Sequence, residues 1–266
     1  MLGVDVGGTK IHCALFKLGK IVKQKTVSTP KKNVKKLVEK IVSVLKGVSP
    51  NPKAIGIGVP GFVSHGTVTG LPNIGIMGRF NLKRMVEKET KGNVKVSIDN
   101  DAKCFALAES RHGVLTGTNT FVAVTVGTGI GGAIVIGGKL HRGRDNLAGE
   151  FGHMKFIKNG KQGKKCGCGE KGCWETYCAG RWIKKVDVDA CKMFGLGLAN
   201  IANAFNPDMI VLGGSMALAY LGQPKNRRLV MKSFEGNALV MVKNTPIRLS
   251  RLNHPCTLGA ALLTGN

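Results

Sequence analysis

The sequence LGVDVGGTK, at residues 2–10, contains the pattern that decides the fold. Apolar Leu2, Val4 and Val6 alternate with small or polar residues, and this spacing predicts a β-strand. The strand runs into a turn rich in glycine and threonine, and residues 11–16 form a second apolar run. A β-hairpin with a Gly-Gly-Thr turn is therefore expected at the start of the chain.

The rest of the first half predicts alternating helices and strands. Apolar residues between Val34 and Leu45 recur at the spacing of an amphipathic helix. Residues 54–59 and 94–98 are short apolar runs that predict strands, and residues 102–112 predict a helix. The pattern is that of a mixed α/β protein.

The same arrangement recurs in the second half. Residues 120–126 predict a strand that breaks at GTGIGG, residues 127–132, and residues 133–136 predict its returning partner. A helix is expected over residues 188–205, and a further strand at 209–212. The two halves are not sequence repeats, but each opens with a glycine-rich hairpin, so we expect a duplicated topology.

The two glycine-rich turns have two interpretations. Glycine lets backbone N–H groups approach a phosphate closely, and threonine adds a hydroxyl donor. Tight turns also need glycine for purely structural reasons, and neither turn matches a Walker A loop or a dinucleotide fingerprint. Two such turns could hold a nucleotide's phosphates, with Asp5 binding Mg²⁺ through water. The alternative for Asp5 is an ordinary residue at a strand end.

A cluster of cysteines marks the second functional segment. Cys166, Cys168 and Cys173 follow the spacing C-x-C-x4-C and come soon after His153. These ligand types are typical of a closed tetrahedral zinc site, which makes a satisfied buried imidazole the weaker interpretation of the histidine. Glu150 precedes this segment and Glu175 ends it. A structural Zn²⁺ would therefore fix the carboxylates of Glu150 and Glu175 in position.

The other cysteines indicate a reducing environment. Of eight cysteines, Cys13, Cys104, Cys191 and Cys256 stand singly among apolar residues, and Cys178 is expected to be a small core residue. The start of the chain shows no signal-peptide pattern, and no apolar run is long enough to span a bilayer. We therefore expect a cytoplasmic protein with no membrane partner.

The net charge of +25 over 266 residues allows two interpretations. One is nucleic-acid binding, and the other is a lysine-rich solvated surface. The basic residues are mostly lysines spread along the chain, and aromatic residues are not interleaved with them as stacking platforms would be. We expect no specific nucleic-acid partner, only a weak attraction to polyanions that fades as salt rises.

Six motifs together resemble the ROK family of sugar kinases and sugar-responsive repressors. They occur in one order along the chain, at residues 5–10 (DVGGTK), 100–102 (NDA), 127–132 (GTGIGG), 148–153 (AGEFGH), 166–175 (CGCGEKGCWE) and 210–214 (IVLGG). The resemblance implies an actin-like ATPase fold of two ribonuclease-H-like lobes with a nucleotide and sugar cleft between them. It places the small lobe at residues 1–115, with a returning helix near 256–264, and the zinc-containing large lobe at 116–255.

The resemblance also implies roles for individual residues. Asp101 resembles the catalytic base that accepts the proton of a sugar hydroxyl, although Asn100 and Asp101 also suit the cap of the following helix. The residues that resemble sugar contacts are Gly61, Asn73, Asn100, Glu150, His153 and Glu175. The residues that resemble contacts to ATP and Mg²⁺ are Asp5, Gly7, Gly8, Thr9, Lys10, Thr128, Gly129, Gly213 and Gly214.

The function implied is ATP-dependent phosphorylation of a hexose, either glucose or an N-acylhexosamine. The alternative is a sugar-sensing regulator or an inactive sugar-binding protein. Family repressors carry an N-terminal helix-turn-helix domain, whereas this chain begins with its first strand, so the regulator is ranked lower. Lys103 stands where the family commonly has asparagine, and the helical insertion after residue 182 is shorter than usual. That shortening leaves open whether the protein forms a homodimer.

Overall fold

The computed structural model describes residues 1–158 and 160–265, and these form two compact units. Unit 1 comprises Met1–His112, Gly143–Leu147 and Leu252–Asn266, and unit 2 comprises Gly113–Arg142 and Ala148–Arg251. Within the described residues, no helix has the length and apolar character needed to span a membrane.

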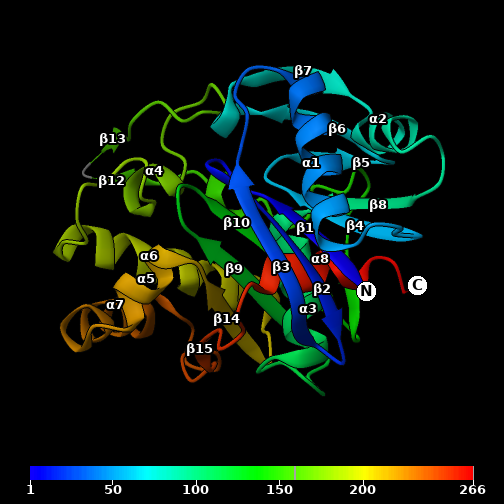
Figure 1. Ribbon diagram of the computed structural model, residues 1–266. Coiled ribbons are helices and arrows are strands. Elements are labelled where there is room, and N and C mark those ends of the chain that lie inside the picture. Colours follow the sequence, from blue (N-terminus) through cyan, green and yellow to red (C-terminus); the bar gives the residue numbers. More distant parts are fainter. Residues whose placement is uncertain (159, 266) are drawn as a thin grey trace. The chain divides into compact units, whose positions relative to one another are not determined.

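Unit 1 is built on a five-stranded sheet of order β3-β2-β1-β4-β8 (Figure 1). Its strands are β1 (Leu2–Val6), β2 (Lys10–Lys17), β3 (Lys20–Ser28), β4 (Ala54–Val59) and β8 (Lys95–Asn100). The hairpin strands β1, β2 and β3 pair antiparallel, whereas β4 is parallel to both β1 and β8. The expected hairpin and both expected later strands are confirmed.

Three helices complete the main layers of unit 1. They are α1 (Val34–Val48), α3 (Asp101–His112) and α8 (Pro255–Leu262). The side chain of Asn33 caps α1 by accepting a hydrogen bond of 2.9 Å from the Lys36 N–H. The apolar residues of α1 that define its predicted periodicity are buried against the sheet.

A small three-stranded sheet and a helix of unit 1 were not predicted. The sheet contains β5 (Phe62–Ser64), β6 (Thr67–Leu71) and β7 (Ile76–Phe80), and the 3-10 helix η1 (Pro72–Ile74) connects two of them. Helix α2 (Leu82–Glu89) follows. Strands of three to five residues interrupted by glycines give too short an alternation to be recognised in sequence.

Unit 2 repeats the sheet of unit 1. Its order β11-β10-β9-β14-β15 has the same pattern of antiparallel hairpin strands followed by parallel strands. The strands are β9 (Phe121–Val126), β10 (Ile130–Ile136), β11 (Lys139–His141), β14 (Met209–Gly213) and β15 (Ile247–Leu249). The predicted duplicated topology is therefore confirmed, although β11 and β15 were not foreseen.

Three longer helices and several short elements accompany the second sheet. The helices are α5 (Val188–Phe205), α6 (Ser215–Leu221) and α7 (Pro224–Asn237). The short elements are β12 (Ile157–Lys158), β13 (Lys161–Gln162), α4 (Glu175–Cys178) and the 3-10 helix η2 (Phe151–His153). Helix α5 has the predicted bounds, because Asp187 accepts a hydrogen bond of 2.8 Å from the Ala190 N–H and Asn206 ends it in the left-handed conformation.

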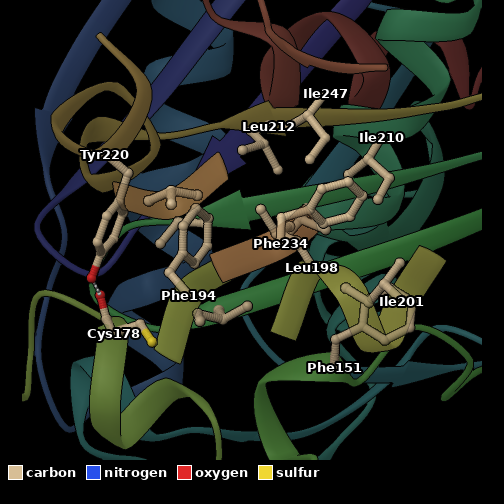
Figure 2. Close-up of a cluster of buried hydrophobic side chains, with 14 of the residues drawn as sticks. Phe151, Cys178, Phe194, Leu198, Ile201, Ile210, Leu212, Tyr220, Phe234 and Ile247 are labelled. Atoms are coloured by element: carbon tan, nitrogen blue, oxygen red, sulfur yellow. Dashed lines mark hydrogen bonds between the residues drawn. The ribbon is translucent and has the colours of Figure 1, made fainter. Parts of the chain in front are cut away.

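The core of unit 2 is organised around aromatic rings, several of which Figure 2 shows. Phe194 stacks on Tyr220 with ring centroids 4.3 Å apart, and on Trp174 at 5.6 Å. The Tyr220 hydroxyl is satisfied by donating to the Cys178 carbonyl at 2.8 Å, and Cys178 is itself buried, as expected. The rings fix the segment after the cysteine motif against α5 and α6.

Glycines allow the helices of unit 1 to approach its sheet unusually closely. Helix α8 packs against β1, β4 and α3. A Cβ atom on Gly56 of β4 would collide with the Ala260 carbonyl of α8, and one on Gly259 of α8 would collide with the Cys104 carbonyl of α3. Backbone therefore lies against backbone on both sides of α8.

The segment Gly143–Leu147 belongs to unit 1, whereas the sequence-based division placed it in the larger lobe. Asn146 anchors it, because the Nδ2 atom donates to the Val63 carbonyl at 2.6 Å and to Asp99 Oδ1 at 3.2 Å. Asn146 has a φ of 61°, a conformation that asparagine tolerates well. This attachment links residues far apart in sequence, so it had no local signal.

The close packing of α8 predicts the effect of adding one methyl group. Gly259→Ala should lower the free energy of unfolding by about 1–3 kcal/mol, because neither neighbouring backbone can move away easily. Gly236→Ala in α7 is the matched control, since no atom lies within 4 Å of its Cβ position. The control should be neutral or stabilising by roughly 0.5–1 kcal/mol. Denaturant unfolding measures both, and equal stability of the two variants would contradict the packing argument.

Candidate functional site

The turn between β1 and β2 is stabilised by backbone contacts and leaves its threonine exposed. The Gly7 N–H donates to the Lys10 carbonyl at 2.9 Å, and the Thr29 hydroxyl donates to the Gly7 carbonyl at 2.8 Å. The side chains of Thr9 and Lys10 are exposed. The turn is thus fixed in shape while its hydroxyl remains available to a ligand.

Asn73 lies directly beside this turn. A Cβ atom on Gly8 would be 3.3 Å from the Asn73 Cβ. The Lys31 ammonium bridges the two segments, because it donates to the Gly8 carbonyl and, at 3.2 Å, to the Asn73 carbonyl. The sequence did not single out Lys31, because lysines are spread along the whole chain.

Two carboxyl groups of unit 1 have raised pKa values. Burial, reinforced by the charge of Asp101, raises the pKa of Asp5 from 3.8 to about 7. Burial also raises the pKa of Asp101 from 3.8 to about 6, against an opposing hydrogen bond of 2.8 Å from the Ala102 N–H. Two desolvated carboxyls at one edge of a sheet form a site that favours a bound proton or a metal cation.

Asp101 is the first residue of α3, one residue earlier than predicted. Asn100 supports this start, because its Oδ1 atom accepts from the Ala102 N–H at 2.9 Å and from the Lys103 N–H at 3.3 Å. Its Nδ2 atom donates to the Gly61 carbonyl at 3.2 Å. The interpretation that this pair caps the helix is correct for Asn100, and it leaves Asp101 rigidly placed.

A buried lysine supports the same end of α3. Lys103 is 1 % exposed, and its ammonium donates to the Asn146 carbonyl. Asp99 is also 1 % exposed and holds the Asn146 amide through Oδ1. Asp99 and Lys103, two members of this polar network, flank Asn100 and Asp101 in the sequence. Its members come from two distant segments, which explains why the motifs did not reveal it.

In unit 2, the turn between β9 and β10 meets the end of β14. The Gly180 N–H donates to the Gly127 carbonyl at 2.8 Å, and the Arg181 N–H donates to the Thr128 carbonyl at 3.1 Å. Thr128 is exposed. Gly214 follows β14 with a φ of 95°, and a side chain there would collide with the Val126 carbonyl. The predicted Thr128 and Gly214 therefore lie at the same end of the second sheet.

The four predicted metal ligands are brought together in unit 2. One ligand atom from each of His153, Cys166, Cys168 and Cys173 lies within 4.8 Å of all the others. Cys166 Sγ is 3.7 Å from His153 Nδ1, and Cys168 Sγ is 3.6 Å from Cys173 Sγ. A Cys₃His set at this spacing fits a structural Zn²⁺. Cys178 is not part of this group.

The predicted sugar-side carboxylates lie beside this cluster. The other ring nitrogen of His153, Nε2, is 3.9 Å from Glu150 Oε2. Glu175 Oε1 accepts from the Cys166 thiol at 2.9 Å, and Oε2 accepts from the Ile130 N–H at 3.3 Å. Glu175 Oε2 would also lie 2.8 Å from a Cβ on Gly129. Glu175 therefore joins the cysteine cluster to the glycine turn of unit 2.

Comparisons with known proteins agree with these motifs. The family model "ROK family" matches residues 1–190. Among similar proteins, the glucokinase of Streptomyces coelicolor is 31 % identical over 81 % of this chain and 82 % of its own length. The N-acetyl-D-glucosamine kinase of Photobacterium profundum is 31 % identical over 84 % of this chain and 87 % of its own length.

A solved structure extends the likeness to the whole fold. The ROK family glucokinase of Streptomyces griseus, in complex with glucose and AMPPNP, superposes with a TM-score of 0.85 at 28 % identity. The match covers 98 % of each chain. With the family model spanning more than half of the sequence, the chain belongs to the ROK family and has the actin-like ATPase fold of its sugar kinases.

Proposed function

We propose that this protein transfers the γ-phosphoryl group of ATP to a hydroxyl of a hexose, either glucose or an N-acylhexosamine, with Asp101 as the general base. The observation that carries the proposal is the desolvated Asp101 carboxyl beside Asp5. The kinases among its relatives support the reaction class. They support a kinase over the alternative of a sugar-sensing regulator.

A sugar hydroxyl is a weak nucleophile at neutral pH, so transfer benefits from a carboxylate that accepts its proton. A pKa near 6 leaves Asp101 ionised at neutral pH and makes it a stronger base than an ordinary aspartate. The hydrogen bond from the Ala102 N–H fixes the carboxyl at the start of α3. The residue therefore combines the position and the proton affinity that the role requires.

The glycine turns and Asp5 are assigned to the nucleotide. Thr9 with Gly7 and Gly8, and Thr128 with Gly129, offer hydroxyl and backbone N–H donors suited to phosphate oxygens. Lys10 adds a positive charge to the first turn, and Gly213 and Gly214 lie at the end of β14, at the same end of the sheet as the second turn. Asp5 would hold Mg²⁺ through water, which favours its ionised form despite burial.

Sugar hydroxyls are assigned to the polar groups next to the cysteine cluster and to Asn100. Glu150 and Glu175 can each accept hydrogen bonds from adjacent hydroxyls, and a site of this kind rejects analogues that lack them. His153 faces the metal ligands with Nδ1 and Glu150 with Nε2. Gly61 is assigned to a loop on the sugar side because its carbonyl contacts Asn100. Asn73, which lies against the first turn, is assigned to the sugar side from the family resemblance alone.

A structural Zn²⁺ fits His153 and the three cysteines, and it would supply rigidity rather than reaction chemistry. Burial and the Glu175 carboxylate hold the pKa of the Cys166 thiol above its usual range. As a metal-bound thiolate, Cys166 would no longer donate to Glu175 Oε1. That oxygen would then be available to a sugar hydroxyl, so we expect metal content and sugar affinity to be coupled.

The reaction is tested by a coupled assay with ATP, Mg²⁺ and a panel of hexoses and N-acylhexosamines. The wild type should phosphorylate at least one of them, and Asp101→Asn should lower kcat/KM by roughly 10²–10⁴-fold because the proton acceptor is lost. Asp145→Asn, which changes an exposed carboxylate paired with Arg144, is the matched control and should keep full activity. An Asp101→Asn variant as active as wild type would refute the assignment.

The raised pKa of Asp101 predicts how stability changes with pH. Folding favours the neutral carboxyl, so this group destabilises the protein progressively as pH rises from its ordinary pKa of 3.8 through about 6. Asp101→Asn cannot ionise and should gain up to about 3 kcal/mol over wild type at pH 8, but little at pH 4. Thermal unfolding without Mg²⁺ or nucleotide measures this. A difference that is equal at both pH values would argue against the raised pKa.

Removal of the metal should destabilise the protein and weaken sugar binding together. Cys168→Ala should lose zinc, measured by atomic absorption, and show a lower Tm and weaker sugar binding. Cys178→Ala is the matched control, because its thiol is buried but outside the four-ligand cluster, so it should retain zinc. A zinc-free protein with unchanged Tm and sugar affinity would contradict the structural role.

A further inference from the structure

Unit 2 contains a hollow that none of the roles above uses. Its volume is about 700 Å³, within the usual range for small-molecule sites. Nine residues line it: Val114, Met209, Leu221, Arg227, Ile247, Arg248, Leu249, Ser250 and Arg251. Five of them form a continuous stretch along β15 and beyond its end. None belongs to a glycine turn, to the cysteine cluster or to the carboxylates assigned to sugar.

The basic residues of the hollow are all arginines. The chain has 30 lysines and 10 arginines, yet three arginines and no lysine line this surface. If the hollow merely shared the chain's general excess of positive charge, its basic residues would be mostly lysines. Arginine differs in carrying a planar fork of donors that binds phosphate or carboxylate with two hydrogen bonds at once. The selection of arginine therefore points to anion recognition rather than to solubility.

The charges of the hollow are not neutralised by the protein. No acidic residue is among the lining residues, and Arg227, Arg248 and Arg251 are exposed. Within the part of the chain that the structure describes, none of the three takes part in an ion pair. Three like charges on one small surface repel one another, so a bound anion would relieve the repulsion.

The edge strand adds backbone donors. β15 is the last strand in the sheet order, and among the strands that the structure describes it pairs only with β14. Hydrogen bonds to β14 use the Pro246 carbonyl and the Ser250 N–H. By the alternation of a strand, the N–H groups of Ile247 and Leu249 face the open edge, while the Ile247 side chain lies in the core (Figure 2).

The remaining lining residues are mainly apolar. The half-buried Met209 and Leu249 would contact the carbon skeleton of a ligand rather than a bare ion. We propose that this hollow binds a small organic phosphate, with the arginines holding the phosphate group and the apolar residues contacting the rest of the molecule. The hollow would then be a second phosphate-binding site of unit 2, separate from the nucleotide-binding turn that contains Thr128.

The test uses neighbouring arginines of one helix. Arg227 and Arg228 are both exposed in α7, but only Arg227 lines the hollow. AMP, pyrophosphate and inorganic phosphate are titrated by calorimetry into wild type, Arg227→Ala, Arg248→Ala and the control Arg228→Ala at physiological ionic strength. AMP should bind wild type best, and it should lose at least about tenfold in affinity in both lining variants but not in the control.

Two further variants separate this site from other sources of binding. Thr128→Ala should leave the AMP affinity unchanged, whereas Arg248→Lys should weaken it because the charge remains but the fork is lost. Equal losses in Arg227→Ala and Arg228→Ala would show a diffuse charge effect and overturn the proposal. It would also be overturned by loss in Thr128→Ala alone, by equal affinity for phosphate and AMP, or by no binding to wild type.

Discussion

The parallel pairing of β1 with β4, and of β4 with β8, determines where the acidic side chains of unit 1 can lie. Parallel strands end at the same edge of a sheet, so Asp5 near the end of β1 and Asp101 just after β8 reach one place. In the register of the sheet, Gly58 of β4 pairs with Asp5 on one side and with Asp99 of β8 on the other. The effect of the Asp101 charge on the pKa of Asp5 follows from this pairing.

Much of this arrangement could be predicted from the sequence, because its signals are local. The alternation around Val4, the periodicity of α1 and the ligand spacing from Cys166 to Cys173 each depend on residues close together in the chain. The cysteine cluster is the clearest case, since the metal-ligand types and their spacing alone identified all four members that the structure brings together. The duplicated hairpins likewise predicted both sheets.

The features that the sequence did not reveal depend on distant contacts. The Asn146 amide binds Val63 and Asp99, and Lys31 bridges Gly8 and Asn73, with separations of 23 to 83 residues. Short strands such as β15 gave no usable alternation, because three residues cannot distinguish a strand from a loop. A run of lysines gave no reason to single out Lys31. The contacts of such residues can be recognised only when the folded structure shows which distant residues lie beside them.

The close packing of α8 against β4 and α3 has a consequence for synthesis on the ribosome. Unit 2 is complete once residue 251 has emerged, but unit 1 still lacks the helix against which Gly56 and Gly259 place two backbones in contact. The first sheet, although translated earliest, therefore lacks part of its covering layer until after the residues of unit 2 have been made. Unit 1 can therefore be completed only after unit 2 has been synthesised, although domains near the N-terminus usually fold first. A nascent chain stalled before Pro255 would expose the apolar face that α8 covers to chaperones and proteases.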